Sequence, residues 1–239
     1  MSDVSKQMII CPHCNRTSLF NIWSSINTKT DPATYSQVRN LSLFKFRCPY
    51  CEKTEIVHYP FLYHQMESAI MIYYQPKGDE LAETQNMFED VNAEALGNPD
   101  AGQDEIQDML KNALAGYRYR VVTTLEDFLE KLAILDAGVD DRIVELTKAM
   151  LGAQVERQLA GEGFRVKGAR FVWEPETKEM KLIFFDKNSD QTASTSFDQH
   201  VANVYNQLID RFSPALEGAH KKDTVIDWNW AMELLRNGK

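Results

Sequence analysis

The chain has no cysteine outside two short strings, CPHC at 11–14 and CPYC at 48–51. It also lacks any run of about 18 apolar residues, and residues 1–10 lack the basic start and long apolar stretch of a secretory signal. These absences argue against a disulfide scaffold and a membrane segment, and we expect a cytoplasmic protein. One question then covers every thiol: the strings are either redox dithiols or joint ligands of a metal ion.

Positive charge is sparse and never forms a dense stripe. Residues 1–78 carry 8 Lys/Arg against 5 Asp/Glu, residues 79–116 carry 1 against 10, and residues 117–239 carry 17 against 20. Proteins that bind nucleic acid gain most of their affinity from Lys and Arg contacts with phosphates. The composition therefore argues against nucleic acid as a partner, and we expect a protein partner. It predicts no particular oligomeric state.

Sequence signatures of enzymes are absent as well. The chain contains no phosphate-binding glycine loop, no nucleophile elbow and no HExxH motif. We therefore name no catalytic residue and no organic cofactor, and we lean against an enzyme while leaving that class open.

Hydrophobic periodicity predicts an α+β protein in three parts. Residues 1–78 alternate apolar and polar side chains and predict a zinc-ribbon-like β domain, with strands that include 41–47, 54–64 and 69–76. Residues 79–103 form an acidic linker, and residues 104–239 form a C-terminal α+β domain. In that domain we expect a helix from Thr124 to Gly138, a second helix directly after it, a hairpin of strands 169–175 and 179–186, and helices over 198–212 and 227–235.

The flanks of the two cysteine strings favour a metal over redox chemistry. A redox dithiol needs its first cysteine at a helix N-terminus, where the helix dipole lowers the thiol pKa. Here both CPxC strings are followed by strand-like sequence, NRTSLFNIW and EKTEIVHYP. Two pairs separated by 33 residues are instead typical of paired zinc knuckles.

In a zinc knuckle, a tight turn points both sulfurs of a Cys-x-x-Cys string at one ion. Asn15 and Glu52 stand where a glycine is usual, and asparagine accepts the positive φ of such a turn better than glutamate does. Four thiolates leave no coordination position for water, so we expect a structural Zn²⁺. Its predicted ligands are Cys11, Cys14, Cys48 and Cys51. No role is expected for His13, His58 or His64.

A second candidate site lies between the two expected helices. Asp140, Asp141 and Arg142 cluster there and are the best candidates for an acid/base or cation site. The alternative that we favour is that the aspartates cap and charge the start of the second helix.

The residues around the two strings resemble the CpXC-domain family of bacterial and archaeal proteins. The resemblance covers most of residues 7–78 and extends more loosely to residues 117–146. It implies zinc and no activity, because the family has no assigned function. It rests on CPHC at 11–14, Ser25-Ile26-Asn27 with Asp31-Pro32, SLFKFRCPYC from Ser42, and YPFLYH from Tyr59 to His64.

The preferred function is that of a protein-interaction or adaptor module, in which zinc stiffens a small sheet with little core of its own. Two alternatives remain open. One is an enzyme or small-ligand-binding protein with a pocket between its two parts. The other is a redox or zinc sensor whose thiolates release the metal on oxidation.

Overall fold

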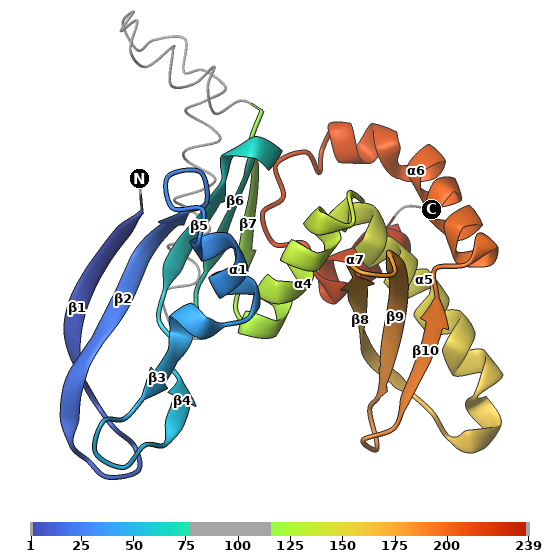
Figure 1. Ribbon diagram of the computed structural model, residues 1–239. Helices are drawn as coiled ribbons and strands as arrows, with labels where there is room; N and C mark the ends of the chain where they lie inside the picture. The colour runs from blue at the N-terminus through green and yellow to red at the C-terminus, as the bar shows by residue number, and fades with distance from the viewer. Residues whose placement is uncertain (1, 77–115, 238–239) are drawn as a thin grey trace, which may run out of the picture. The chain divides into compact units, whose positions relative to one another are not determined.

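The computed structural model describes residues 2–76 and 116–237, which fall into two compact units, Met1–Phe128 and Leu129–Lys239 (Figure 1). Both units combine helices and strands, so the predicted α+β class is confirmed. The predicted acidic linker, residues 79–103, lies outside the described residues.

The first unit is built on a five-stranded sheet with the order β1-β2-β5-β6-β7. β1 pairs antiparallel with β2, β2 parallel with β5, β5 antiparallel with β6, and β6 parallel with β7. β7 follows the acidic stretch in sequence and still completes this sheet. The strands are β1 (Asp3–Ile10), β2 (Thr17–Asn27), β5 (Phe61–Gln65), β6 (Ile70–Tyr74) and β7 (Arg118–Val122).

Between β2 and β5 the chain forms α1 (Thr34–Arg39) and a small hairpin of β3 (Lys45–Arg47) and β4 (Thr54–Ile56). The predicted strand over 41–47 is wrong in its first half, because Leu41 takes a left-handed backbone (φ 60°) and Ser42–Phe44 forms a 3₁₀ turn. The predicted strand over 54–64 splits into β4 and β5. Pro60 lies in the break, as expected of a residue that cannot donate to a ladder.

Aromatic rings make up much of the core of the first unit. The Phe44 and Phe61 rings stack with their centroids 4.8 Å apart. Phe128 meets Phe61 and Tyr63 edge-on at centroid distances of 5.1 and 5.6 Å. Edge-to-face contacts of this kind are favourable beyond the area they bury, so they help to hold the first turn of the next helix against the sheet.

That helix is α4 (Leu125–Asp136), which begins in the first unit and ends in the second. The expected helices and hairpin of the second unit are confirmed, and the structure adds one strand, β10, that the sequence pattern did not predict. The remaining elements are α5 (Asp141–Gln158), β8 (Val166–Glu174), β9 (Glu179–Asp186), β10 (Thr192–Ser196), α6 (Gln199–Glu217) and α7 (Trp228–Asn237).

α5 is the central helix of the second unit (Figure 1). One side packs on the antiparallel sheet β10-β9-β8, where Phe171, Leu182 and Phe184 are buried. Another side packs against α6 and α7 through Leu146, Phe212 and other apolar residues. Because α5 is covered on several sides, even its charged residues Glu145 and Lys148 are buried.

Candidate metal centre

The two CPxC strings form nearly identical turns. The amide of Cys11 donates to the carbonyl of Arg16 and that of Cys48 donates to the carbonyl of Lys53, both at 2.9 Å. Asn15 and Glu52 donate back to the carbonyls of Cys11 and Cys48, also at 2.9 Å.

The residue after each second cysteine closes the turn with a left-handed backbone. φ is 55° at Asn15 and 59° at Glu52. At these two positions of a Cys-x-x-Cys turn a glycine is usual, because glycine adopts a positive φ without strain. Each turn also supplies an amide donor to its second sulfur, from Arg16 to Cys14 and from Lys53 to Cys51.

The structure brings all four predicted sulfurs together. The Sγ of Cys11 lies 3.7 Å from the Sγ of Cys51, and the Sγ of Cys14 lies 3.6 Å from the Sγ of Cys48. All four sulfurs lie within 4.8 Å of one another. A disulfide requires sulfurs about 2.05 Å apart, so the thiols are not paired covalently. Four thiolates around one zinc at about 2.3 Å place neighbouring sulfurs roughly 3.8 Å apart, and the cluster fits such an ion.

Backbone amides favour the thiolate form of Cys48, the form that binds a cation. Burial opposes ionisation of Cys48, but the amides of Cys51 and Tyr50 and the neighbouring thiols of Cys11 and Cys14 outweigh it and lower the Cys48 pKa to about 6. At Cys14 the amide of Arg16 favours the thiolate, while burial and the other cysteines outweigh it and raise the pKa to about 11. Such a cluster holds protons that a divalent cation displaces when it binds.

Apolar side chains pack around the inner sulfurs. Cys11 and Cys48 are buried together with Phe46, while Cys14 and Cys51 are half-buried. Phe20 of β2 meets Phe46 of β3 edge-on at 5.8 Å, so the long β1–β2 hairpin and the β3–β4 hairpin lie side by side at the cluster (Figure 1). This contact is one of those that join the two hairpins beside the sulfurs.

The histidines of this unit have partners other than the cluster. His13 is bonded through Nε2 to Glu55 of β4, which ties the first turn to the second hairpin. His58 Nδ1 lies 2.8 Å from the Tyr74 hydroxyl. His64 Nε2 lies 3.0 Å from the Tyr117 hydroxyl, and burial lowers the pKa of His64. Among the described residues, the group with metal-ligand spacing contains cysteines alone.

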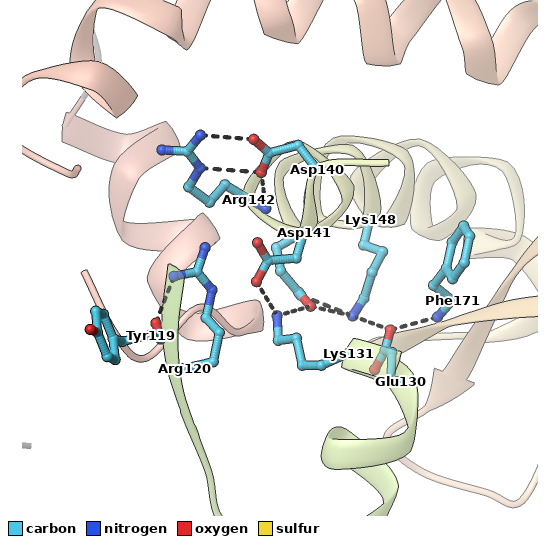
Figure 2. Close-up of polar contacts among 10 residues, drawn as sticks. Tyr119, Arg120, Glu130, Lys131, Asp140, Asp141, Arg142, Lys148 and Phe171 are labelled. Carbon is cyan, nitrogen blue, oxygen red and sulfur yellow. Dashed lines mark hydrogen bonds and ion pairs between the residues drawn. The ribbon is translucent and has the colours of Figure 1, made fainter. Parts of the chain in front are cut away.

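The second candidate site lies at the start of α5. Asp140 caps α5 by accepting a hydrogen bond from the Arg142 amide at 2.9 Å. Its carboxylate also accepts two hydrogen bonds from the Arg142 guanidinium, at 3.1 and 2.8 Å. That guanidinium donates to the carbonyl of Leu216 at 2.9 Å as well. Asp141 instead lies 3.2 Å from the Nζ of Lys131. The two aspartates thus have separate partners (Figure 2).

A buried ionic cluster in the second unit was not predicted (Figure 2). The Nζ of Lys148 lies 2.8 Å from Glu130 Oε1 and 2.9 Å from Glu145 Oε2, and Lys131 reaches Glu145 Oε1 at 3.4 Å. Glu130 also accepts from the backbone amide of Phe171 in β8 at 2.6 Å. Although burial opposes its charge, the carboxylates of Glu145 and Glu130 raise the pKa of Lys148 above its ordinary value. Burial raises the pKa of Glu145, against the effect of Lys148.

No described helix is both long and apolar enough to cross a bilayer.

Comparison with known proteins identifies a family. The family model described as CpXC protein matches residues 9–148, which include all four cysteines and extend into α5. No curated protein and no solved structure matches the chain. The match covers more than half of the chain and confirms the resemblance seen in the sequence, so the chain belongs to the CpXC family.

Proposed function

We propose that Cys11, Cys14, Cys48 and Cys51 hold one Zn²⁺ as a structural ion. The observation that carries this proposal is the closeness of the four sulfurs. They come from two turns that are far apart in the sequence, and all lie within 4.8 Å of one another. Zinc favours four thiolates in a tetrahedron, and a closed Cys₄ shell is typical of structural sites.

The ion would stabilise a part of the protein that has little core. The apolar cluster at the sulfurs contains few buried residues, Cys11, Phe46 and Cys48, and β3 and β4 have three residues each. A two-stranded hairpin of this size is not stable by itself in water. Bonds from one ion to both turns would supply the missing stabilisation, as they do in small zinc domains.

We further propose that the stiffened first unit serves as a protein-interaction module in the cytoplasm. The chain lacks the sequence signatures of common enzymes, and the outer part of the sheet exposes large apolar residues, among them Met8, Ile10 and Leu19. The rival prediction of a pocket between the two parts stays a prediction.

Metal analysis of the purified full-length chain tests the zinc proposal. We expect one zinc per chain, and no fast-reacting thiol in the native protein. After denaturation in the presence of a chelator, all four cysteines should react with a thiol reagent. Fast reaction of near-stoichiometric native thiols, or a stoichiometry far from one, would contradict a structural site.

One observation favours the sensor as a second candidate. Cys14 and Cys51 are half-buried, so an oxidant reaches them more easily than Cys11 or Cys48. In such a sensor, two thiolates give two electrons to hydrogen peroxide, one disulfide forms, the peroxide is reduced to water and Zn²⁺ leaves. Release of zinc by a small excess of peroxide, reversed by a thiol reductant, distinguishes this role from a purely structural one.

A further inference from the structure

β1 forms an open edge of the five-stranded sheet. In the sheet order it pairs with β2 and with no other described strand. Seven of its eight residues are exposed. The opposite edge strand, β7, is mostly buried. An exposed strand edge carries unpaired backbone donors and acceptors, which can pair with another strand.

The register shows which backbone groups face outward. The Cys11 amide donates to the Arg16 carbonyl, so this pair is a hydrogen-bonded one. The register then runs without a shift from Ile10 opposite Thr17 to Val4 opposite Trp23. Hydrogen-bonded and non-hydrogen-bonded pairs alternate in an antiparallel ladder. The residues whose N–H and C=O groups point away from β2 are therefore Val4, Lys6, Met8 and Ile10.

The side chains of these same residues form an apolar stripe. Val4 is 46% exposed, Met8 61% and Ile10 66%, and Leu19, which lies opposite Met8, is 61% exposed. Lys6 is the one charged residue among the four outward-facing residues of β1. Natural edge strands are often protected by proline, by charged side chains such as lysine, or by a bulge, and Lys6 is the one such device in the middle of β1. β1 has neither proline nor glycine, and its register shift lies at its end, between Asp3 and Val4.

We propose that β1 is a homodimer interface, paired antiparallel with β1 of a second copy of this chain. A two-fold axis near Gln7 places Val4 opposite Ile10 of the other copy and Lys6 opposite Met8. This register pairs all the outward-facing residues and extends one apolar stripe across both sheets.

The neighbouring symmetric registers are less favourable. A shift toward the N-terminus places Lys6 opposite Lys6 of the other copy, and like charges directly opposite each other are destabilising. A shift toward the C-terminus places Met8 opposite Met8 and leaves Val4 without a partner. The lone lysine thus excludes the register in which it would meet its own equivalent, and the register centred near Gln7 pairs more of the outward-facing residues than the remaining one.

The dimer does not depend on the metal proposal. Zinc content and far-UV circular dichroism are measured for every variant, so loss of the metal centre is distinguished from loss of dimerisation.

A pair of opposite-charge variants tests the register. Met8→Glu places a carboxylate opposite Lys6 of the other copy, twice per dimer, while Met8→Lys places an ammonium there. We expect dimer in sedimentation equilibrium of the full-length, metal-loaded chain at concentrations on the order of 100 μM. The dimer of the Met8→Glu variant should have a dissociation constant at least about tenfold lower than the dimer of the Met8→Lys variant. Equal Kd values for the two variants, or a monomer at all concentrations in the unaltered chain, would overturn the proposal.

A backbone variant tests the edge itself. Met8→Pro removes an N–H that points away from β2, so the β1–β2 ladder keeps its bonds while the dimer loses donors. We expect monomer for Met8→Pro and a smaller loss of dimer for the control Met8→Ala. A dimer that Met8→Pro leaves unchanged would mean that another surface, or another partner strand, is used. If Met8→Pro loses its zinc or its β signal, the comparison of Met8→Glu with Met8→Lys decides the question alone.

Discussion

The ammonium of Lys148 lies 2.8 Å from Glu130 Oε1, and the two side chains are 3% and 6% exposed. The same ammonium lies 2.9 Å from Glu145, so one lysine on α5 contacts two carboxylates in the interior of the second unit. Breaking a buried ion pair by removing one partner leaves an uncompensated charge, which is much more destabilising than replacing the whole pair.

Lys148→Met should therefore lower the free energy of unfolding by about 3–5 kcal/mol. The matched control is Lys181→Met, which removes the exposed pair with Glu179 and should change stability by about 0–1 kcal/mol. Urea unfolding followed by circular dichroism measures both. Equal effects of the two variants would mean that the buried carboxylates find other partners.

Gly152 of α5 is in close contact with α7. A Cβ at this position would lie 2.6 Å from Cη2 of the Trp228 indole. Alanine normally favours a helix over glycine by about 1 kcal/mol, but a contact this short forces the indole to move, at about 1–3 kcal/mol. We expect the clash to outweigh the gain, so that Gly152→Ala lowers the midpoint of thermal unfolding.

Two further variants check this mechanism. Adding Trp228→Leu to Gly152→Ala should change stability less than the sum of the two single changes, because the shortened side chain removes the clash. Gly161→Ala, at a position with open space, should stay within about 0.5 kcal/mol of the unaltered protein.

Asn15 and Glu52, the residues with a left-handed backbone after the two cysteine strings, differ in how much this backbone destabilises the folded state. Glutamate at a positive φ is strained, so Glu52→Gly should raise the free energy of unfolding by about 1 kcal/mol. Loss of the exposed ion pair between Glu52 and Arg47 reduces this gain slightly. Asn15→Gly should change little, because asparagine tolerates this backbone. Thermal unfolding of the metal-loaded variants measures the difference. A larger gain at Asn15 would contradict the explanation by strain.

Cys48→Ser should lose the metal, because serine at neutral pH does not replace a thiolate at zinc. We expect the β signal of residues 7–76 to be lost while the helices of the second unit stay largely formed. Metal analysis with far-UV and near-UV circular dichroism tests this, and a native β signal without metal would contradict it. The control His13→Ala loses the bond to Glu55 and should keep the metal.

Asp186 makes the stability of the second unit depend on pH. The Ser189 hydroxyl donates to it at 2.6 Å and the Arg165 amide at 2.8 Å, and these bonds lower the pKa of Asp186 below its ordinary value. An acid whose pKa is lower in the folded state stabilises that state above its unfolded pKa, near 3.8, and this contribution is lost as the pH falls through the folded value.

The stability advantage of the unaltered protein over Asp186→Asn should thus be constant above about pH 5 and shrink below about pH 4. Urea unfolding across this range measures it, with Asp190→Asn as an exposed control. An advantage that grows on acidification would have the wrong sign for this mechanism.

Several local features were predictable from the sequence. The CPxC strings predicted their turns, and Thr124 and Asp140 predicted the helix starts where their side chains accept amides at 3.0 and 2.9 Å. Such features depend on residues within a few positions of each other, so they can be recognised from the sequence without knowledge of the fold. The polar strand β10 escaped prediction because its pairing with β9, not its own composition, makes it a strand.

The sequence by itself determined which thiols exist, how each pair turns, and that the chain is CpXC-like. The paired spacing predicted that the two turns share one ion, and only the tertiary structure showed which contacts bring them together, among them that of Phe20 with Phe46 between hairpins far apart in the chain. The tertiary structure also decided that Lys148 is buried among carboxylates, since a helical pattern shows spacing along one helix and not what covers each side of it. Long-range packing selects among the arrangements that local sequence allows, and so it governs both the sulfur cluster and the buried charges.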